Sequence, residues 1–496
     1  MPRLPWRAGL ALVALAALSC CGQEPTGRAG LAEWVECPVT GQPTRECSTV
    51  SVPVDYANPS GPRLEMAMSR LPAPDRARRI GVLVYNPGGP EAQGVYVPAA
   101  LWPRQLTDAF DIIGFDPRGV GQSNRVDCGT PQGAVVELAK LPSLTAIPDV
   151  NAVDSSARAF VTECEQRLGP LAGQLGSLAV AHDVDAIRRA LGEKQLSLWM
   201  HSYGSIIGEA YLATYPDRVR AALFTGAVDT ATSGVDYTLQ AERPMPQPPG
   251  GDSLANVFTT TLRQSLAGFA PWCREHAEEC PISEDPVGQA KAAARLRQQP
   301  APGEEPAYRT VLDAAFAVSL DPPHWPEFGT AVAQAGTGDP TGLKRLATGG
   351  VPADIAALLS SRPSTALLLG AYCTDFAWAK SVLGVLNDYR SAGARESHTP
   401  QTASTFVSCG AWPRPAPPLG PLRNPGRVRP LIVNGDEDHF TPLSGARAVA
   451  SRFNASLLVV KANSGQVVGA GVPCADAAAT VYLVNGRHPQ RTECGA

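Results

Sequence analysis

The sequence predicts an α/β protein in which a doubly wound, mostly parallel β-sheet carries a helical cap insertion. Short runs rich in β-forming residues, such as IGVLVYNP at 80–87 and QLSLWM at 195–200, end in turn residues. They alternate with helical patterns such as AHDVDAIRRALG at 181–192. Strands that alternate with helices form parallel sheets that helices cover on both faces. From about residue 235 to 425, helical stretches mix instead with proline-rich breaks, which indicates an insertion.

The first residues have the features of an export signal. Two arginines precede the run AGLALVALAALS, which is too short to span a bilayer comfortably. The CCGQ that follows resembles the lipidation site of a bacterial lipoprotein. We therefore expect a signal peptide at 1–20, lipidation of Cys21 or else of Cys20, and a tether at 21–33. Plain secretion without a lipid is the alternative.

The remaining boundaries follow from the other strand patterns. FDIIGFDP at 110–117 and RAALFTGAV at 220–228 indicate strands before the insertion. RPLIVNGDED at 429–438 and ASLLVVKAN at 455–463 indicate strands after it, and the proline-rich run PRPAPPLGPLRNPGRVRP before them is a stiff connector. We expect a sheet domain in two parts with the cap and connector between them, at 34–234, 235–425 and 426–496.

Composition and charge exclude several functions. The net charge of −4 does not favour the concentrated basic face of nucleic-acid-binding proteins, so no nucleic-acid partner is expected. Of the twelve cysteines, ten remain after Cys20 and Cys21, and an exported chain would oxidise them. They show no Cys-x-x-Cys spacing, so no metal or cofactor is expected. The ten cysteines, whose pairing the spacing leaves open, are Cys37, Cys47, Cys128, Cys164, Cys273, Cys280, Cys373, Cys409, Cys474 and Cys494.

Ser202 lies in LWMHSYGS, between a predicted strand and a predicted helix, with a glycine two positions later. This pattern indicates a nucleophile elbow, a tight turn that lifts a serine hydroxyl above the end of a sheet. The N–H of Tyr203 could then stabilise an oxyanion. Elbows usually have a second glycine two positions before the serine, but Met200 stands there, so we expect crowding between strand and helix. The alternative is a serine that only caps a core helix.

Two further motifs lie at the ends of predicted strands. NPGGP at 86–90 has consecutive glycines, which allow the backbone to approach a ligand closely. Gly89 would be the second oxyanion donor, although a simple tight turn would look the same. NGDEDHFTP at 434–442 places Asp438 where a carboxylate could orient a histidine one strand later. The chain order serine, acid, histidine fits this architecture.

These motifs, with DIIGFDPRGVGQS, SYGSIIGEAYLATYPDRV and CADAAATVYLVNGRHPQRTEC, resemble the secreted tripeptidyl aminopeptidase group of actinobacteria. These proteins are α/β-hydrolases related to prolyl aminopeptidase, with a characteristic C-terminal segment, and the resemblance covers roughly residues 34–496. It implies Ser202 as nucleophile, Asp438 as acid, and Gly89 and Tyr203 as oxyanion donors. It also implies that the disulfides join neighbours along the chain: Cys37–Cys47, Cys128–Cys164, Cys273–Cys280, Cys373–Cys409 and Cys474–Cys494.

Three departures from that family fall at the expected site. The Gly-His of the family is Gly465–Gln466 here, within NSGQVVGAG. Glu91 replaces the glycine after NPGGP, and Met200 replaces the first elbow glycine. A glutamine amide offers hydrogen bonds but takes no proton near pH 7. Gln466 would therefore keep the shape of the histidine position while disabling its chemistry.

Another histidine could replace the missing base only if the fold brought it to Ser202. His439 adjoins Asp438 and His201 adjoins the nucleophile, but neighbouring residues project differently, so neither is expected to serve. His488 is expected at the surface. The remaining histidines carry no motif, and these are His182, His276, His324 and His398.

The sequence supports two function hypotheses. In the first, the protein is an exported serine exopeptidase or esterase that uses an unrecognised base on a peptide or small ester, and that is weak or inactive because Gln466 replaces the histidine. In the second, it is a catalytically silent protein of the cell envelope that binds peptides or another partner. Either protein would touch a membrane only through its lipid anchor.

Overall fold

The computed structural model describes most of the chain from residue 31 onward. The expected signal peptide, both candidate lipidation cysteines and most of the tether lie outside the described residues, as do Gln466, His324, His398 and His439. Within the described segments, no helix has both the length and the apolar character needed to cross a membrane. The described segments are 31–37, 45–96, 102–129, 131–241, 269–295, 325–348, 364–393, 399–414, 417–438, 440–462, 467–469 and 472–495, with residues 266, 311 and 314.

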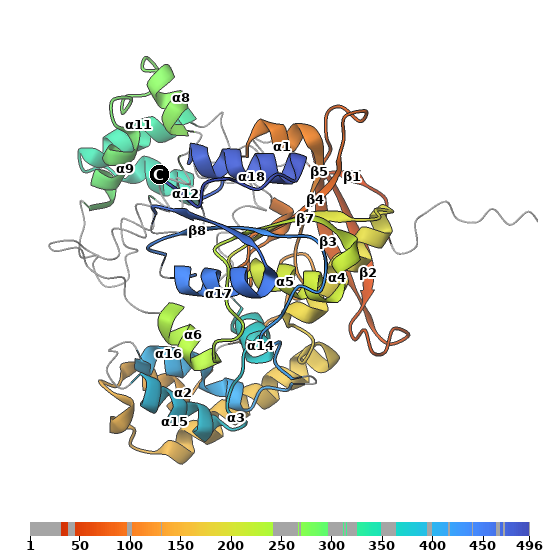
Figure 1. Cartoon of the computed structure of the whole chain (residues 1–496). Helices are drawn as coiled ribbons and strands as arrows, with labels where there is room; N and C mark the ends of the chain where they lie inside the picture. The colour runs from red at the N-terminus through yellow and green to blue at the C-terminus, as the bar shows by residue number, and fades with distance from the viewer. Residues whose placement is uncertain are drawn as a thin grey trace, which may run out of the picture.

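Ten described strands form one sheet, and their arrangement confirms the predicted doubly wound α/β fold (Figure 1). The order across the sheet is β1-β2-β3-β5-β4-β6-β7-β8-β9-β10. The first three strands pair antiparallel with their neighbours, and all pairs from β5–β4 onward are parallel. The strands are β1 (Val35–Glu36), β2 (Glu46–Pro53), β3 (Arg63–Leu71), β4 (Gly81–Asn86), β5 (Phe110–Phe115), β6 (Leu196–His201), β7 (Val219–Thr225), β8 (Leu431–Gly435), β9 (Ser456–Val460) and β10 (Glu493–Cys494).

Helices cover both faces of the sheet, because the central strands carry apolar side chains on both sides. In β6, Leu198 and Met200 pack on one face and Trp199 packs on the other. Strands that are buried on two faces account for the continuous apolar runs in the sequence. The first face is covered by α4 (Ser177–Leu191), α5 (Gly204–Thr214) and α17 (Leu443–Phe453), and the second by α1 (Arg104–Ala109) and α18 (Pro473–Asn485).

The helices described between β7 and β8 form two separate groups (Figure 1). One group has an apolar core of its own, which includes Phe269 and Phe328. It comprises α8 (Phe269–Glu275), α9 (Pro286–Arg295), α11 (Trp325–Gly336) and α12 (Thr341–Thr348). The other group packs with two helices from before β6, and we call the whole set the helical lobe. The lobe consists of α2 (Ala134–Glu137), α3 (Val150–Leu168), α6 (Gly234–Ala241), α14 (Thr365–Asp375), α15 (Val382–Ala392) and α16 (Thr399–Phe406).

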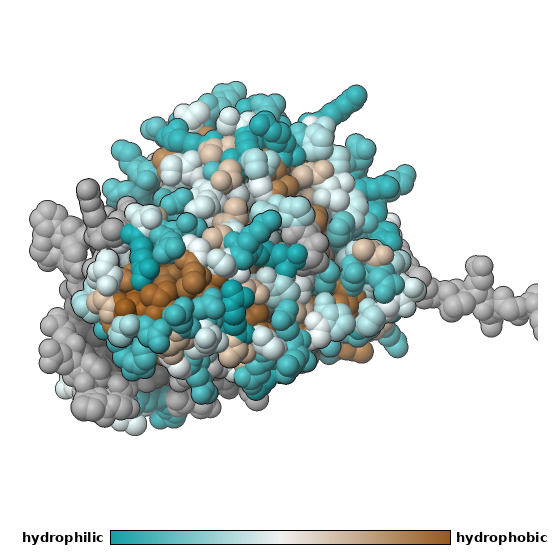
Figure 2. Space-filling view, turned by 90° about the horizontal axis from the view of Figure 1, so that it is seen from below, coloured by the Kyte–Doolittle hydropathy of each residue, from teal (hydrophilic) through white to brown (hydrophobic). Residues whose placement is uncertain are grey.

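The helical lobe therefore combines segments that are far apart in the chain. Helices α2 and α3 come from within the range 34–234 expected for the sheet domain, yet they pack against α14, α15 and α16. Figure 2 shows the face on the lobe side, with an apolar area among hydrophilic groups. Val136 of α2 and Leu383 of α15 are among the exposed large apolar side chains.

Ten described cysteines form five disulfides, and each joins neighbours along the chain, as the family resemblance implies. Two of these disulfides lie in the helical lobe, and each spans a sequence separation of 36 residues. The others join β1 to β2, close a turn after α8, and join α18 to β10. The pairs are Cys37–Cys47, Cys128–Cys164, Cys273–Cys280, Cys373–Cys409 and Cys474–Cys494.

Helix α5 carries a carboxyl group that is fully buried. Neither carboxylate oxygen of Glu209 has a hydrogen-bond partner. The charged groups that act on it, Arg452 and Asp229, pair with each other at 2.6 Å and affect it in opposite directions. Burial raises the pKa of Glu209 well above its ordinary value. The folded protein therefore keeps this group protonated over a pH range in which the unfolded chain releases the proton.

Replacing Glu209 with glutamine should stabilise the protein at neutral pH and have little effect in acid. Because the folded-state pKa is raised, the stabilising contribution of the wild-type group is present below the unfolded value of 4.5 and is lost as the pH rises toward the folded pKa. Urea unfolding should show an advantage for Glu209→Gln that grows by about 1.4 kcal/mol per pH unit in that range. Glu163→Gln, at an exposed ion pair with Arg167, is the control. Parallel pH curves for wild type and Glu209→Gln would contradict this expectation.

Candidate active site

Ser202 occupies a tight turn between β6 and α5. Its φ angle is 53°, in the left-handed region that residues other than glycine rarely adopt. The backbone N–H of Ser202 donates to the carbonyl of Thr225 on β7 at 2.8 Å, and its carbonyl accepts from Ser205 at 2.8 Å. A strand, a strained serine and a helix thus follow one another directly, which is the geometry of a nucleophile elbow.

The expected crowding around Met200 is relieved by a glycine on the elbow helix. A Cβ atom on Gly208 would lie 2.9 Å from Cγ of Met200 and 2.5 Å from a ring carbon of Phe224. Met200 is fully buried in the apolar cluster that β6 shares with α4, α5 and α17. Its side chain therefore fills space behind the elbow, where Gly208 leaves room for it.

The Gly-Gly turn after β4 touches the elbow through backbone atoms. Gly88 and Gly89 have φ angles of 86° and 110°, and the side chain of Asn86 accepts from the N–H of Gly88 at 2.9 Å. A Cβ atom on Gly88 would lie 2.5 Å from the carbonyl oxygen of His201 and 2.9 Å from the N of Tyr203. In the described part of the chain, the N–H groups of Gly89 and Tyr203 donate to no other group. Gly88, the residue before Gly89, thus lies against the backbone of Tyr203, and the oxyanion hole expected from Gly89 and Tyr203 stays a prediction.

Asp438 lies in the loop after β8, where an acid is expected. Its side chain is buried, and one carboxylate oxygen accepts from the N–H groups of Phe440 at 2.9 Å and Thr441 at 3.0 Å. The other oxygen accepts from the hydroxyl of Thr441. Asn434 fixes the same loop, since its side chain donates to the carbonyl of Thr441 at 2.9 Å and accepts from Ala227 at 3.1 Å. The carboxylate is therefore held rigidly near the end of the sheet.

Gln466 belongs to the segment between β9 and α18, which is where the sequence places the third triad position. The residue itself lies outside the described part of the structure. The two residues after it, Val467 and Val468, are buried in the apolar cluster beneath α1 and α18. The N–H of Gly469 donates to Asp476 at 2.7 Å. The segment is thus anchored to the core directly after Gln466.

No described histidine takes the place of the missing base. The hydroxyl of Ser202 forms no hydrogen bond with a described side chain. Nδ1 of His201 bonds the hydroxyl of Thr225 at 3.0 Å, and burial lowers the pKa of His201 to about 4, so it is neutral at pH 7. The others have partners elsewhere: Tyr215 for His182, Trp272 for His276 and Tyr482 for His488.

Glu91 places a carboxyl group beside the Gly-Gly turn, and one of its oxygens has no partner among the described residues. Its Oε2 atom is buried without a hydrogen-bond partner and lies 3.2 Å from the position that a Cβ atom on Gly89 would occupy. Burial raises the pKa of Glu91, and no cation among the described residues offsets that effect. If ionised, this carboxylate would oppose the negative charge that an oxyanion hole must stabilise.

Two supporting residues were not among the predicted site residues. Asn86 holds Gly88 and lies against the start of α5, where a Cβ atom on Gly204 would be 2.6 Å from Oδ1 of Asn86. Its position at the head of NPGGP could have indicated this role. Thr225 accepts from the N–H of Ser202 and contacts His201, and no local pattern in the sequence distinguishes it.

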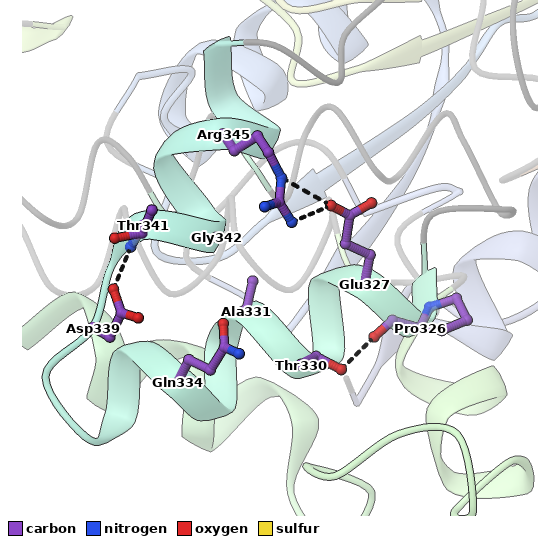
Figure 3. Close-up of a pocket in the computed structure, with 9 residues that line it drawn as sticks. All are labelled: Pro326, Glu327, Thr330, Ala331, Gln334, Asp339, Thr341, Gly342 and Arg345. Carbon is purple, nitrogen blue, oxygen red and sulfur yellow. Dashed lines mark hydrogen bonds and ion pairs between the residues drawn. The ribbon is translucent and has the colours of Figure 1, made fainter.

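A cavity of about 400 Å³ between α11 and α12 offers no second candidate (Figure 3). Four of its polar side chains already have partners within this helix pair, and these are Glu327, Thr330, Asp339 and Arg345. Arg345 pairs with Glu327 at 2.6 Å, Asp339 accepts from the N–H of Thr341, and Thr330 donates to the carbonyl of Pro326. Across the described residues, no cluster of side chains could hold a metal ion.

The strand order, the serine elbow, the Gly-Gly turn beside it and the acid after β8 define an α/β hydrolase. Comparison with known families agrees. The chain matches the α/β hydrolase fold family over residues 81–261 and the TAP-like protein family over residues 396–494. The protein therefore belongs to the TAP-like α/β hydrolases, as the sequence motifs predict.

Several relatives align along most of the chain. The tripeptidyl aminopeptidase of Streptomyces lividans is 29% identical, with 94% of this chain and 86% of that protein covered. A serine protease of Mycobacterium tuberculosis is 27% identical, with 97% and 95% covered. A carboxylesterase of the same species is 28% identical, with 90% and 85% covered.

Among solved structures, a proline iminopeptidase-related protein of Thermus thermophilus is 16% identical, with 91% of this chain and 98% of that chain covered. The TM-score is 0.32, so this likeness carries no argument about function.

The strain at the elbow predicts that Ser202→Gly is more stable than Ser202→Ala. Glycine adopts a φ angle of 53° at little cost, whereas alanine keeps the steric penalty of the left-handed region. Because glycine also raises the entropy of the unfolded chain, we expect a net advantage of only about 0.5–1 kcal/mol. Urea unfolding of the two variants measures it. A glycine variant less stable than the alanine variant would show that the elbow is not strained.

Proposed function

We propose that this protein is an exported serine hydrolase of the tripeptidyl aminopeptidase type that binds peptides but hydrolyses them weakly or not at all. The observation that supports this proposal most directly is Gln466 at the sequence position of the family's triad histidine, in a chain whose elbow and Gly-Gly turn have the backbone geometry of a hydrolase. The relatives named as a tripeptidyl aminopeptidase and a serine protease suggest a peptide ligand. A catalytically silent peptide-binding or partner-binding protein of the envelope is the alternative.

The expected loss of activity follows from proton transfer. A serine hydroxyl becomes a nucleophile only when a base removes its proton as it attacks. In a well-studied serine protease, removing the histidine lowers turnover roughly a millionfold, and the oxyanion hole alone retains only a rate about 10³–10⁴ times that in water. The amide of Gln466 could bond both Ser202 and Asp438 without taking up the proton.

Glu91 is a second obstacle to catalysis. The developing oxyanion would meet a buried carboxyl group beside Gly89 that no described cation neutralises. Restoring the histidine alone would therefore leave an unfavourable charge in the site whenever Glu91 is ionised. Met200 presents no such obstacle, since it packs behind the elbow.

Export and lipidation are parts of the same proposal. The apolar run before CCGQ supports a signal peptide with lipidation at Cys21 or Cys20. Five disulfides suit an oxidising compartment outside the cytosol. A lipid anchor would then hold the sheet domain at the membrane surface through the tether at 21–33.

Restoring two residues should restore hydrolysis. With a fluorogenic tripeptide amide, wild-type turnover should match that of Ser202→Ala. We expect Gln466→His to raise turnover, and Gln466→His with Glu91→Gly to raise it further, by at least about 10² over wild type, because the second change removes the opposing charge.

Ser202→Ala in the double variant is the matched control and should abolish the gain. Robust wild-type turnover that Ser202→Ala abolishes would overturn the proposal of weak or absent hydrolysis. Calorimetry of wild type with the same tripeptide tests binding separately, and an absence of binding would contradict a peptide ligand.

A further inference from the structure

A carboxyl group from the helical lobe contacts the elbow directly. Asp375, the last residue of α14, is fully buried, and its Oδ2 atom accepts from the hydroxyl of Tyr203, the residue after the nucleophile. The same atom accepts from the hydroxyl of Ser177 at 2.5 Å. The N–H of Ser177, at the start of α4, donates to both carboxylate oxygens at 2.9 and 3.1 Å. One side chain of the lobe thus holds two elements of the sheet domain.

The fit between α14 and the sheet domain is close. Tyr372, one turn before Asp375, stacks on the ring of Tyr203 with centroids 5.2 Å apart. A Cβ atom on Gly176 would lie 2.6 Å from the side chain of Thr374. One on Gly370 would lie 2.5 Å from that of Leu175. Small shifts of α14 would therefore be transmitted to the residues that it contacts.

The partners of Asp375 are all neutral hydrogen-bond donors. Burial raises the pKa of this group to about 6, and the bonds from Ser177 and Tyr203 act in the opposite direction. Burial, together with the adjacent charge of Asp375, raises the pKa of Tyr203 well above its ordinary value. The phenol therefore stays protonated and donates a hydrogen bond to Asp375. Among the described residues no cation compensates the carboxylate, so each of these hydrogen bonds helps to stabilise its buried charge.

We propose that Asp375 is a positioning residue that holds Tyr203, and with it the second oxyanion N–H, in place only while the helical lobe is seated on the sheet domain. The site is then regulated by the position of the lobe, and ligands that displace α14 weaken the oxyanion hole. This inference rests on the proposed function and deepens it, because it names the residue through which the helical lobe controls the same site.

The test compares Asp375→Asn, Tyr203→Phe and their double variant in the full chain carrying Gln466→His. Tyr203→Phe removes only one hydroxyl and keeps both the ring stack and the backbone N–H. Ser177→Ala is the matched control, because it removes another donor to the same carboxylate and leaves the hydrogen bond from Tyr203 to Asp375 in place. Two quantities are measured: the rate at which a fluorophosphonate labels Ser202, and hydrogen exchange in the peptide that spans β6 and the start of α5.

Both single variants should lower the labelling rate about tenfold, because a displaced donor stabilises the transition state less well. The double variant should be no slower than Tyr203→Phe, since that change already removes the bond that Asp375→Asn weakens. Exchange around Tyr203 should increase in all three. Ser177→Ala should lower the midpoint of thermal unfolding. The labelling rate of Ser202 and the hydrogen exchange of the elbow peptide should stay at the values of the parent chain.

Additive losses, or equal losses in Ser177→Ala, would show that Asp375 has only a structural role. If Asp375→Asn does not fold, the hydrogen exchange and the labelling rate of Tyr203→Phe decide whether the bond to Asp375 positions the elbow. A parent chain that is not labelled at all would contradict the expected gain of activity from Gln466→His, and hydrogen exchange would still reveal whether Asp375 holds the elbow.

Discussion

The site depends on a contact between two backbone turns. Gly88 brings the turn after β4 against the carbonyl of His201 and the N–H of Tyr203, at distances that leave no room for a side chain. Gly204 allows Asn86 to approach the elbow equally closely. Because main-chain atoms form this contact, it depends on the fold and on the two glycines and not on the side chain at position 466.

The three departures from the family differ in their structural consequences. The side chain of Met200 fits into the core, because Gly208 on the facing helix leaves the space that it needs. Glu91 has no such compensation and buries an unpaired carboxyl oxygen at the edge of the oxyanion turn. The packing around the elbow therefore accommodates Met200, whereas one carboxyl oxygen of Glu91 has no hydrogen-bond partner among the described residues.

Local sequence patterns predicted the sheet, the elbow, the Gly-Gly turn and the position of Asp438. Each of these features depends on a few adjacent residues at the end of a strand. Ser202, Gly89, Tyr203 and Asp438 all lie where those patterns placed them. Features that depend on distant packing were not predictable. Nothing in the segment around Asp375 distinguishes it from other residues of a helical insertion, and its partner Ser177 is 198 residues away in the sequence.

The composition of the helical lobe has a consequence for the order in which the parts of the chain fold. Helices α2 and α3 precede strand β6 in the chain, and their partners α14, α15 and α16 follow long after it. Until those partners fold, the apolar faces of α2 and α3 lack a cover, and contacts of such long sequence separation form late. The disulfide between Cys128 and Cys164 can close within the early segment and restrain it. The elbow, which depends on Asp375, would then be among the last parts of the molecule to reach its final form.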